Sequence, residues 1–373
     1  MADKASPAGA NGLLVHEWIE ERGGSENVLD ELALTFPAAP ILCLWNNAPQ
    51  RFAEGRVTES WISRTPLRRS KSAALPFMPL TWRSIERRDV DWILASTHLF
   101  AHHVRVGHKG HAPSKYLYVH TPARYLWEPE LDARGDTFVA RTASRVLRPL
   151  DRRRAAEATA IAANSEFVRQ RIQRCWDRDS IVIYPPVDVD AYTRMPEEQL
   201  TDADRQQLAV LPSEFLLGAS RFIPYKQLDV VIGAGKAVGL PVVIAGDGPS
   251  RAELVAHAER VGADVTFVDR PSQPLLNALY RRAIAYIFPP VEDFGIMPVE
   301  AMAAGSPVIA RNIGGVAESV HDGKTGVLLE DFSPASVRAA VERAAGIDRS
   351  ACVSRAREFA AERFRSEILG WVS

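Results

Sequence analysis

The chain has 373 residues, of which 46% are hydrophobic and 24% charged, and its formal net charge is −1. This length exceeds what one core usually organises, so two domains of similar size are expected. The near-neutral charge, without a recognised module, argues against nucleic-acid binding. The chain has an odd number of cysteines, and the three are widely scattered: Cys43, Cys175 and Cys352. This argues against a disulfide framework and for a reducing compartment.

Residues 1–12 are rich in Ala, Gly, Ser and Pro and lack the apolar core of a signal peptide. No stretch approaches the ~18 apolar residues of a membrane span. We therefore expect a disordered leader over residues 1–12 and a cytoplasmic protein.

The first half alternates strand and helix patterns. A strand at 13–15 precedes a helix that Ser25 can cap, because apolar residues recur from Val28 to Phe36 at helical spacing. Further strands are expected at 41–44, 92–95, 115–119 and 160–163. A strand beginning at Ile181 ends at two prolines, Pro185 and Pro186, which suit a domain junction.

The second half is more regular. Strands are expected at 215–218, 242–245, 265–268, 285–288, 308–310 and 327–329, each followed by a helical pattern, which predicts a doubly wound parallel sheet. A long amphipathic helix is expected from Ala351 to about Leu369.

The most informative stretch is Glu292-Asp-Phe-Gly-Ile-Met-Pro-Val-Glu300, which lies between a buried strand and a helix that Pro298 can open. Amides around Gly295 would bind a diphosphate at the carboxyl end of the sheet, with Glu300 left to grip ribose hydroxyls. The alternative is that Glu300 only caps its own helix. That arrangement needs Ser or Thr three residues earlier, where the sequence has Met297.

Two glutamates spaced in this way around Phe-Gly resemble the signature of retaining glycosyltransferases of family 4, and within it the bacterial mannosyltransferases of surface-polysaccharide assembly. The resemblance implies an α/β protein with the GT-B fold, in which two Rossmann-like doubly wound domains face each other across a cleft. It implies an acceptor domain at 13–184, a nucleotide-sugar donor domain at 185–350, and a C-terminal helix at 351–373 that crosses back to the first domain.

The segment Ser220-Arg-Phe-Ile-Pro-Tyr-Lys226 follows a strand, so Arg221 and Lys226 should lie at the carboxyl edge near Glu292. Two cations there can stabilise the charge that develops on a departing diphosphate. By resemblance, the catalytic residues at this edge are Arg221, Lys226 and Glu292. The resemblance also implies that no metal or other cofactor is required.

Glycine turns should line the donor site. By resemblance, the turn with Gly246 and Asp247, together with Arg270 after the next strand, faces the nucleotide, although turn chemistry alone also explains the glycines. Further donor-binding residues are Phe294, Gly295, Ile296 and Glu300, and in the first domain Gly23 and Gly24. Glu17 stands where relatives often carry aspartate, which leaves its role open.

His120 ends another strand within His-Thr-Pro-Ala-Arg-Tyr-Leu-Trp127. Without context such a histidine is more often structural, but the resemblance implies that it contacts the donor sugar and is catalytic. Arg124 and Tyr125 would shape the acceptor pocket, with packing as the alternative for the tyrosine. Asp188-Val-Asp190 superficially matches an Asp-x-Asp metal motif, but it follows the two prolines and is interpreted as linker.

Residues 61–88 mix cations with large apolar side chains. The basic residues of 64–88 are Arg64, Arg68, Arg69, Lys71, Arg83, Arg87 and Arg88, with Glu86 as the one acid. This pattern suits an anionic membrane surface. A solvated loop over packed helices explains it equally well.

We expect the protein to transfer a hexose, mannose from GDP-mannose before other donors, to a hydroxyl of a saccharide or lipid-linked acceptor. A UDP-hexose or deoxysugar-nucleotide donor stays open. A nucleotide-sugar epimerase or a non-catalytic carbohydrate-binding protein would share the fold. An NAD-dependent oxidoreductase would need a complete glycine fingerprint, which does not appear in the sequence.

Overall fold

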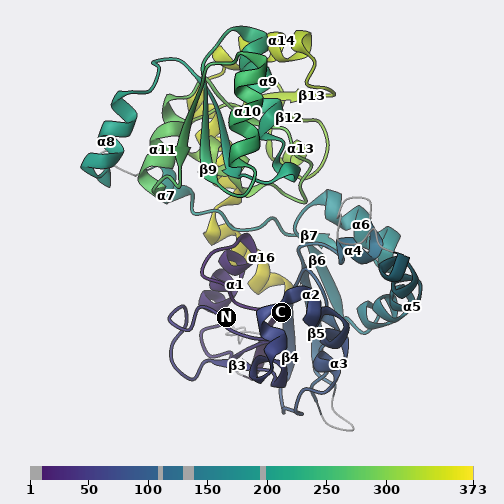
Figure 1. Ribbon diagram of the computed structural model, residues 1–373. Helices are drawn as coiled ribbons and strands as arrows, with labels where there is room; N and C mark the ends of the chain where they lie inside the picture. The colour runs from purple at the N-terminus through teal and green to yellow at the C-terminus, as the bar shows by residue number, and fades with distance from the viewer. Residues whose placement is uncertain (1–10, 108–111, 129–137, 194–198, 373) are drawn as a thin grey trace, which may run out of the picture. The chain divides into compact units, whose positions relative to one another are not determined.

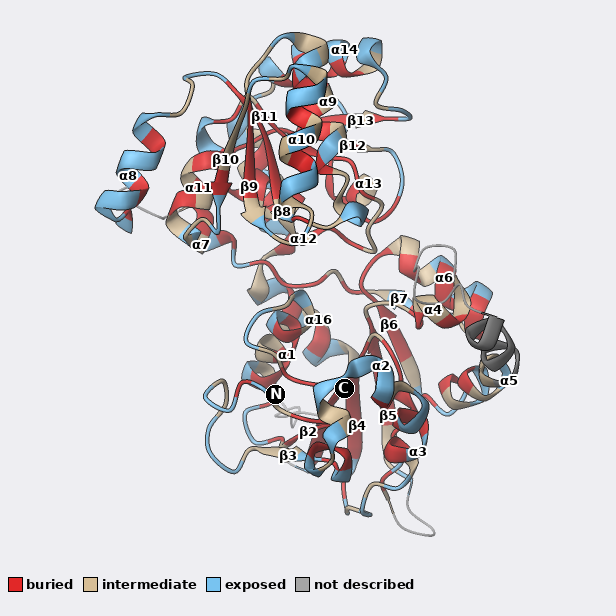
Figure 2. Cartoon of the chain, in the orientation of Figure 1, coloured by how far each residue is buried: buried red, intermediate tan, exposed pale blue. Residues whose placement is uncertain are grey.

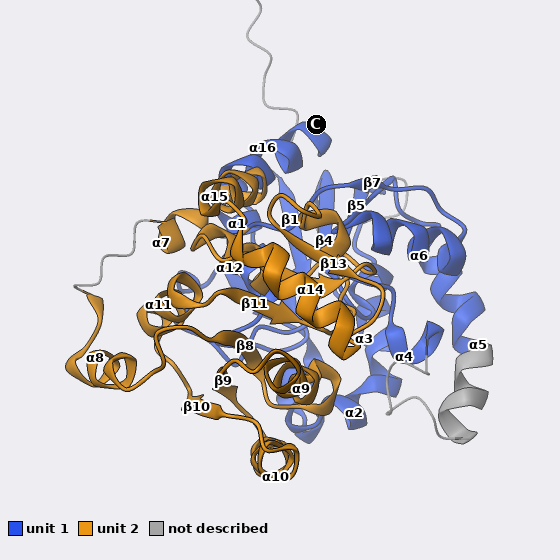
Figure 3. Ribbon diagram, turned by 90° about the horizontal axis from the view of Figure 1, so that it is seen from above, with its two compact units in different colours: residues 1–186, 362–373 blue, residues 187–361 orange. Residues whose placement is uncertain are grey.

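The computed structural model describes residues 11–107, 112–128, 138–193 and 199–372, and for residues 138–146 the backbone alone. The chain divides into two compact units, which Figure 3 colours separately: unit 1 contains residues 1–186 and 362–373, and unit 2 contains residues 187–361. Of the expected leader, residues 1–10 lie outside the described part, and Gly12 already belongs to the first strand.

Unit 1 is built on a seven-stranded parallel sheet with the order β3-β2-β1-β4-β5-β6-β7. The strands are β1 (Gly12–His16), β2 (Ile41–Cys43), β3 (Val57–Glu59), β4 (Trp92–Thr97), β5 (Ser114–Val119), β6 (Ala160–Ala163) and β7 (Ile181–Val182). The helices are α1 (Gly24–Thr35), α2 (Lys71–Ala74), α3 (Met78–Arg83), α4 (Arg124–Trp127), α5 (Phe138–Ala155), α6 (Glu166–Trp176) and the C-terminal α16 (Ala361–Trp371). Four short 3₁₀ helices in the described chain of this unit are η1 (Trp61–Arg64), η2 (Pro66–Arg69), η3 (Leu75–Phe77) and η4 (Ala101–His103).

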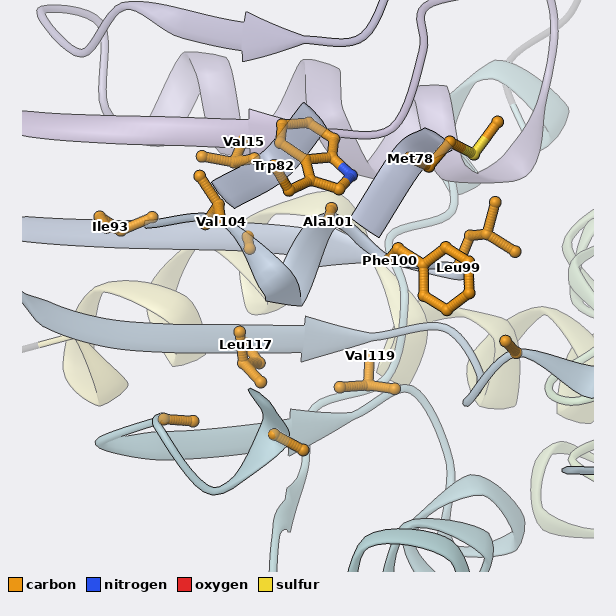
Figure 4. Packing of buried hydrophobic residues seen from close by; sticks show 14 of the residues in the cluster. Val15, Met78, Trp82, Ile93, Leu99, Phe100, Ala101, Val104, Leu117 and Val119 are labelled. Atoms are coloured by element: carbon orange, nitrogen blue, oxygen red, sulfur yellow. The ribbon is translucent and has the colours of Figure 1, made fainter. Parts of the chain in front are cut away.

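Successive residues of each strand of unit 1 pack on opposite faces of the sheet, as the two-residue period of a strand requires. On one face Val15 and Leu117 pack with Met78 and Trp82 of α3, as Figure 4 shows. On the other face the neighbouring Tyr118 packs with α1 and α16. Both faces of the sheet centre are therefore buried, and Figure 2 shows the inner strand β4 in red, whereas the edge strands β3 and β7 are more exposed.

The last helix of the chain belongs to unit 1. Phe364 of α16 makes an edge contact with Tyr118, at 5.5 Å between ring centroids, and Arg365 forms an ion pair with Glu31 of α1. The prediction that the C-terminal helix returns to the first domain is confirmed.

Unit 2 has a six-stranded parallel sheet with the order β10-β9-β8-β11-β12-β13. The strands are β8 (Leu216–Arg221), β9 (Val242–Asp247), β10 (Val265–Asp269), β11 (Ala285–Phe288), β12 (Val308–Arg311) and β13 (Gly326–Leu329). The α-helices, shown in Figure 1, are α7 (Val189–Thr193), α8 (Asp202–Ala209), α9 (Leu228–Val238), α10 (Arg251–Val261), α11 (Gln273–Arg282), α12 (Ile296–Ala303), α13 (Val316–Ser319), α14 (Pro334–Ala345) and α15 (Arg349–Ala356). The 3₁₀ helices in the described chain of this unit include η8 (Pro224–Lys226) and η9 (Arg357–Phe359). The doubly wound α/β architecture predicted for both halves is confirmed.

Two local expectations are wrong, and one strand was missed. Strand β3 was not predicted, and its residues are only partly buried. Helix α1 begins at Gly24 with Gly23 as its N-cap and no side-chain cap, so Ser25 lies inside the helix. The long final helix is broken between α15 and α16, because Ala360 is extended and Val187 donates a backbone hydrogen bond to Phe359 (2.9 Å).

In each sheet the strand order reverses between two neighbouring strands, β1 and β4 in unit 1 and β8 and β11 in unit 2. Loops that leave the carboxyl ends of such strands run in opposite directions and leave a crevice in which open α/β sheets bind ligands. The topology therefore points to the segments that follow these four strands.

Replacing Phe364 with alanine should destabilise unit 1 by about 3–5 kcal/mol, because the ring is buried between α16 and the sheet. The measurement is urea unfolding followed by circular dichroism. The exposed Ser366→Ala, in the same helix, is the control and should lose nothing. Equal stability of the two variants would show that α16 does not complete the core.

Candidate functional site

The carboxyl ends of β8 and β11 bring together two charged residues that are 66 positions apart in the sequence. Lys226, in the 3₁₀ turn after β8, forms an ion pair with Glu292, in the loop after β11. The adjacent Tyr225 hydroxyl donates to the carbonyl oxygen of Val291. Because β8 and β11 are hydrogen-bonded neighbours, the segments that follow them begin side by side at this edge. The expected neighbourhood of Lys226 and Glu292 is therefore present.

Arg221 is the last residue of β8 and its side chain is exposed at the same edge. Within the described part of the chain, no ion pair or side-chain hydrogen bond is recorded for its guanidinium. A planar fork of donors without a carboxylate partner is suited to bind a phosphate. Arg221 thus supplies positive charge that Glu292 does not neutralise.

Two glycines after β12 hold the Glu292 loop in place. The Gly315 amide donates to the Glu292 carbonyl oxygen at 2.9 Å. A Cβ on Gly314 would lie 2.7 Å from that same oxygen, and one on Gly315 would lie 2.3 Å from the Cα of Phe294. Any side chain at these two positions would push the loop away. The sequence analysis missed them, although a Gly-Gly pair directly after a strand is the kind of signal it used elsewhere.

Helix α12 begins at Ile296, two residues before the predicted start at Pro298. Its N-cap is Gly295, which adopts φ 85° in the left-handed region and makes no side-chain cap. Glu300 is consequently the fifth helical residue and does not cap its own helix. The first amides of α12, beginning at Ile296, are left for an anion, as at other helix N-termini.

The carboxyl group of Glu300 is surrounded by tyrosines. Burial raises its pKa to about 7, and a hydrogen bond with Tyr192 of α7 acts in the opposite direction. Tyr192 is itself fixed, because its hydroxyl accepts from the Gln273 amide at 2.5 Å and its carbonyl accepts from Asn277 at 3.0 Å. Tyr192, which sequence reasoning missed because it precedes Glu300 by more than a hundred residues, therefore orients this carboxyl.

The segments at the carboxyl ends of β9 and β10 are each held against the neighbouring strand. A Cβ on Gly246, whose φ is 144°, would lie 1.9 Å from the Ser220 carbonyl oxygen. The Arg270 amide donates to the Gly246 carbonyl at 2.8 Å, and Asp247 lies 3.6 Å from the exposed Arg270 guanidinium. Arg270 has a positive φ of 48°. These predicted donor residues line the same edge as Arg221.

Phe294 does not offer its side chain to a ligand. The ring is buried and packs against Phe359 at 5.5 Å between centroids. The predicted donor contact of Phe294 is thus limited to its backbone, because the ring anchors the Glu292 loop. Ile296, by contrast, is partly exposed at the start of α12.

In unit 1, Gly23 and Gly24 lie at the N-terminus of α1, as expected. The carboxylate of Glu26 folds back over this turn, so that a Cβ on Gly23 would lie 2.0 Å from its Oε2. Glu26 is buried, and its carboxylate accepts from the Ser25 hydroxyl at 2.9 Å and from the Glu20 amide at 3.3 Å. A helix N-terminus favours an anion, and the Glu26 carboxylate lies at this one. The predicted phosphate contact of Gly23 and Gly24 stays a prediction.

His120 follows β5 at the carboxyl edge of the unit 1 sheet. Burial lowers its pKa to about 3, with a further lowering from His98, whose ring centroid lies 6.2 Å away. The Nε2 of His120 is 2.8 Å from the Ser96 hydroxyl. The histidine is therefore neutral at pH 7. It can exchange hydrogen bonds with a sugar hydroxyl but carries no charge of its own.

The open question of Glu17 has a structural answer. Glu17 is buried and its Oε1 accepts from the Thr97 hydroxyl and from three backbone amides, of His98, Leu99 and Ala101, at 2.8–3.2 Å. This carboxylate caps the turn after β4 and shapes the loop that carries His98.

Arg124 and Tyr125, the predicted acceptor residues, lie in α4 beyond His120 and are both partly buried. Tyr125 makes an edge contact with Phe100 at 6.2 Å, which supports a packing role. Asp188 accepts from the Ala191 amide at 3.0 Å at the start of α7. Helix capping at the junction accounts for Asp188 without a metal ion.

A buried group in unit 1 escaped the sequence analysis, in which no metal cluster was recognised. His102, His103 and Asp151 place potential ligand atoms within 4.8 Å of one another. Both histidine Nε2 atoms lie 2.9–3.0 Å from Asp151 Oδ1, and the indoles of Trp127 and Trp176 donate to Oδ2 at 2.8 and 2.7 Å. These four contacts satisfy the carboxylate, so the group is accounted for as a packing network around α5.

Glu300→Gln should change how stability depends on pH. A carboxyl whose folded pKa is raised from 4.5 to about 7 stabilises the fold below pH 4.5, and that contribution is lost as the pH rises through 7. Relative to Glu300→Gln, the wild type should lose at most about 3 kcal/mol between pH 4.5 and 8. Urea unfolding at several pH values measures this difference. Glu342→Gln, on the exposed face of α14, is the control, and a pH-independent difference for Glu300→Gln would contradict the buried carboxyl.

The chain is similar in sequence to curated glycosyltransferases. The chain is 34% identical over 188 residues to the D-inositol 3-phosphate glycosyltransferase of Mycobacterium sp. (strain JLS), which is 47% of this chain and 42% of that relative. The protein of the same description from Mycolicibacterium smegmatis (strain ATCC 700084 / mc(2)155) is 35% identical over 189 residues, with the same coverage. The aligned part thus spans less than half the length of these curated relatives.

Solved structures match nearly the whole chain. Anabaena Alr3699/HepE in complex with UDP-glucose has a TM-score of 0.68 at 20% identity, covering 96% of this chain and 98% of that one. WaaG, a glycosyltransferase involved in lipopolysaccharide biosynthesis, has a TM-score of 0.67 at 17% identity, covering 97% and 99%. At these identities the likeness shows the fold, which is GT-B.

Two family models divide the chain between them. The model described as Glycosyltransferase Family 4 matches residues 22–191, and the model described as Glycosyl transferases group 1 matches residues 201–358. One lies mainly in unit 1 and the other in unit 2. Together with the fold, these matches show that the chain belongs to the group 1, family 4 glycosyltransferases.

Proposed function

We propose that the protein transfers a hexose from a nucleoside diphosphate sugar to an acceptor hydroxyl with retention of configuration, and that unit 2 binds the donor. The observation that carries the proposal is the group of Arg221, Lys226 and Glu292 beside the N-terminus of α12. A nucleotide sugar presents a diphosphate, a ribose and a hexose. This edge of the sheet offers cations, amides and two carboxyl groups.

The cations have a chemical task. The glycosidic bond of the donor breaks as negative charge develops on the phosphate oxygen, and preorganised donors at that oxygen lower the barrier most. Arg221 and the amides of α12 supply such donors. Lys226 adds a positive charge when it exchanges its partner Glu292 for the phosphate. Glu292 then holds hydroxyls of the hexose and stabilises positive charge at the anomeric carbon. The acceptor attacks on the side of the leaving group, and the departing phosphate oxygen takes its proton.

Glu300 is proposed to bind the ribose. Once ionised, its carboxylate can accept hydrogen bonds from two hydroxyl groups, and Tyr192 keeps it oriented. Since its pKa is about 7 without ligand, nucleotide binding and deprotonation of Glu300 should be linked. This carboxyl is better suited to a neutral diol than to the diphosphate, from which charge would repel it.

Two donors are in competition. The motifs around Arg221 and His120 favour GDP-mannose, whereas the related Anabaena structure was determined with UDP-glucose. The base is contacted by loops whose backbone is fixed by Gly246 and Arg270, and those contacts suit either nucleotide. Thermal-shift measurements with GDP, UDP, ADP and dTDP, followed by donor hydrolysis assays, separate the two.

We propose that no metal ion takes part, because the cations above can supply the positive field that a divalent ion would otherwise supply. Turnover should then persist in EDTA. A nucleotide-sugar epimerase is the rival with the same fold, and it would convert the donor without any acceptor. Product analysis in reactions that lack an acceptor distinguishes the two.

The acceptor proposal concerns the surface of unit 1. Of the basic residues in 64–88, Arg83 is paired with Glu157, Lys71 with Glu20, and Arg68 donates to Asn47. Ile62, Met78 and Trp82 are buried in the core. Much of this composition is therefore explained by packing, which was the alternative interpretation.

Some large apolar side chains of this segment remain exposed. Trp61, Phe77 and Leu80 are 43%, 44% and 64% exposed. The Trp61 indole donates to Ser84 at 3.1 Å, which places it beside the end of α3, while Phe77 and Leu80 are three residues apart and share one face. With the exposed Arg64 and Arg69, these residues form the apolar-basic surface. We propose that it contacts an anionic membrane from the cytoplasmic side and that the acceptor is lipid-linked.

No helix in the described ranges is long and apolar enough to cross a bilayer.

Arg221→Ala and Glu292→Ala should each lower kcat by about 10²–10³ while the fold is retained, because each removes a group that acts on developing charge. Steady-state kinetics with the donor found by thermal shift, alongside circular dichroism, measure the effect. Arg260→Ala, an exposed arginine of α10 away from the site, is the control and should match the wild type. Near-normal rates for either site variant would refute the assignment.

Trp61→Ser combined with Leu80→Ser should weaken binding to vesicles that contain phosphatidylglycerol by at least about tenfold. The reason is that the membrane can no longer bury two large apolar side chains. Binding of the wild type should also fall with added salt and be weak on phosphatidylcholine alone. Vesicle co-sedimentation measures both effects. Val210→Ser, which changes an exposed side chain of unit 2, is the control. Equal binding by the double variant would leave the apolar-basic surface without this role.

A further inference from the structure

Three neighbouring strands of unit 1 align one hydroxyl between two histidines. His16 ends β1, Ser96 lies in β4 directly opposite it, and His120 follows β5. The Ser96 Oγ is 3.2 Å from His16 Nδ1 and 2.8 Å from His120 Nε2. His16 and Ser96 are fully buried, so no water competes for these contacts. Parallel pairing of β1, β4 and β5 fixes the geometry.

The contacts constrain where the protons are. A serine hydroxyl has one proton and can donate to one of the two ring nitrogens, so the other nitrogen must donate to it. Burial lowers the pKa of His16 well below its usual value and that of His120 to about 3, so both rings are neutral. Each neutral ring carries one proton. The position of the proton on His16 therefore determines its position on His120.

One observation places the proton of His16 on Nδ1. The other nitrogen, Nε2, is buried and has no hydrogen-bond partner among the described residues, and an unpaired buried donor is rarer than an unpaired acceptor. His16 thus donates through Nδ1 towards Ser96.

We propose that Ser96 and His16 are positioning residues that set the tautomer of His120. Ser96 accepts from His16 Nδ1 and donates to His120 Nε2, so that His120 carries its proton on Nδ1 and presents an N–H donor to the ligand. Within the described chain, Nε2 is the one nitrogen of His120 for which a hydrogen bond is recorded, which leaves Nδ1 for a sugar oxygen.

The inference rests on the proposed function only in naming the sugar as the ligand. A donor aimed at a hydroxyl oxygen would fix how the hexose is held beside its anomeric carbon. With the opposite tautomer, His120 would present a bare acceptor there. A hydroxyl that had been held through its oxygen would then have to rotate and donate.

The tautomer is measured directly on the unliganded protein by long-range proton–nitrogen NMR with ¹⁵N-labelled histidine, using His120→Asn to assign the signal. The expected result is a protonated Nδ1 and a bare Nε2 for His120 in the wild type. Ser96→Ala should mix or reverse this pattern, while Ser96→Thr, which keeps the hydroxyl, should preserve it. A wild-type His120 that carries its proton on Nε2 overturns the proposal, whether or not any variant folds.

Kinetics test the consequence. Ser96→Ala should lower kcat/KM for the donor by at least about tenfold, the effect of roughly one hydrogen bond, and Ser96→Thr should restore it. Ser60→Ala is the matched control, because it removes another buried hydroxyl of unit 1, which donates to the Leu44 carbonyl at 3.0 Å. A tautomer that changes in Ser96→Ala without any loss of rate would overturn the positioning role. If no nucleotide sugar is turned over by the wild type, the proposed function fails. The NMR result still decides whether Ser96 and His16 set the tautomer of His120.

Discussion

The parallel pairing of β8 with β11 is the constraint on which the candidate site depends. It brings the loops after two strands that are far apart in sequence to one edge of the sheet, where Lys226 pairs with Glu292. The two glycines after β12 add a second constraint, because no side chain fits where they press on the Glu292 loop. The charged groups are thus positioned by backbone pairing, which is a rigid way to preorganise donors and acceptors.

Two carboxyl groups of the proposed donor site in unit 2 already have partners, because Glu292 is paired with Lys226 and Glu300 with Tyr192. In unit 1, the carboxylate of Glu26 lies over the N-terminus of α1. Arg221 is the contrasting case, since no partner is recorded for it in the described chain. A diphosphate would therefore meet Arg221 directly, whereas contact with Lys226 requires an exchange of partners. In the proposed mechanism, donor binding therefore competes with this ion pair.

Sequence patterns predicted the fold class and most strands, because buried parallel strands are short apolar runs that end at glycine or proline. They also predicted that Arg221, Lys226 and Glu292 follow adjacent strand ends. They failed where distant contacts decide the outcome. Helix α12 begins after Gly295, earlier than predicted, and the predicted last helix is interrupted at the extended Ala360. Neither the contact of Tyr192 with Glu300 nor the hydroxyl of Ser96 between two histidines has a local signature, because each joins segments that meet only in the folded sheet.

The central claim is that cations and helix amides of unit 2 bind a nucleoside diphosphate without a divalent ion. Isothermal titration of UDP and GDP in EDTA, with the wild type and Arg221→Ala, tests it most directly. The account predicts that one of the two nucleotides binds the wild type in EDTA and that Arg221→Ala weakens that binding by about tenfold to a hundredfold, the effect of losing one charge-assisted contact. Binding that appears only with Mg²⁺, or that is unchanged in Arg221→Ala, would contradict it.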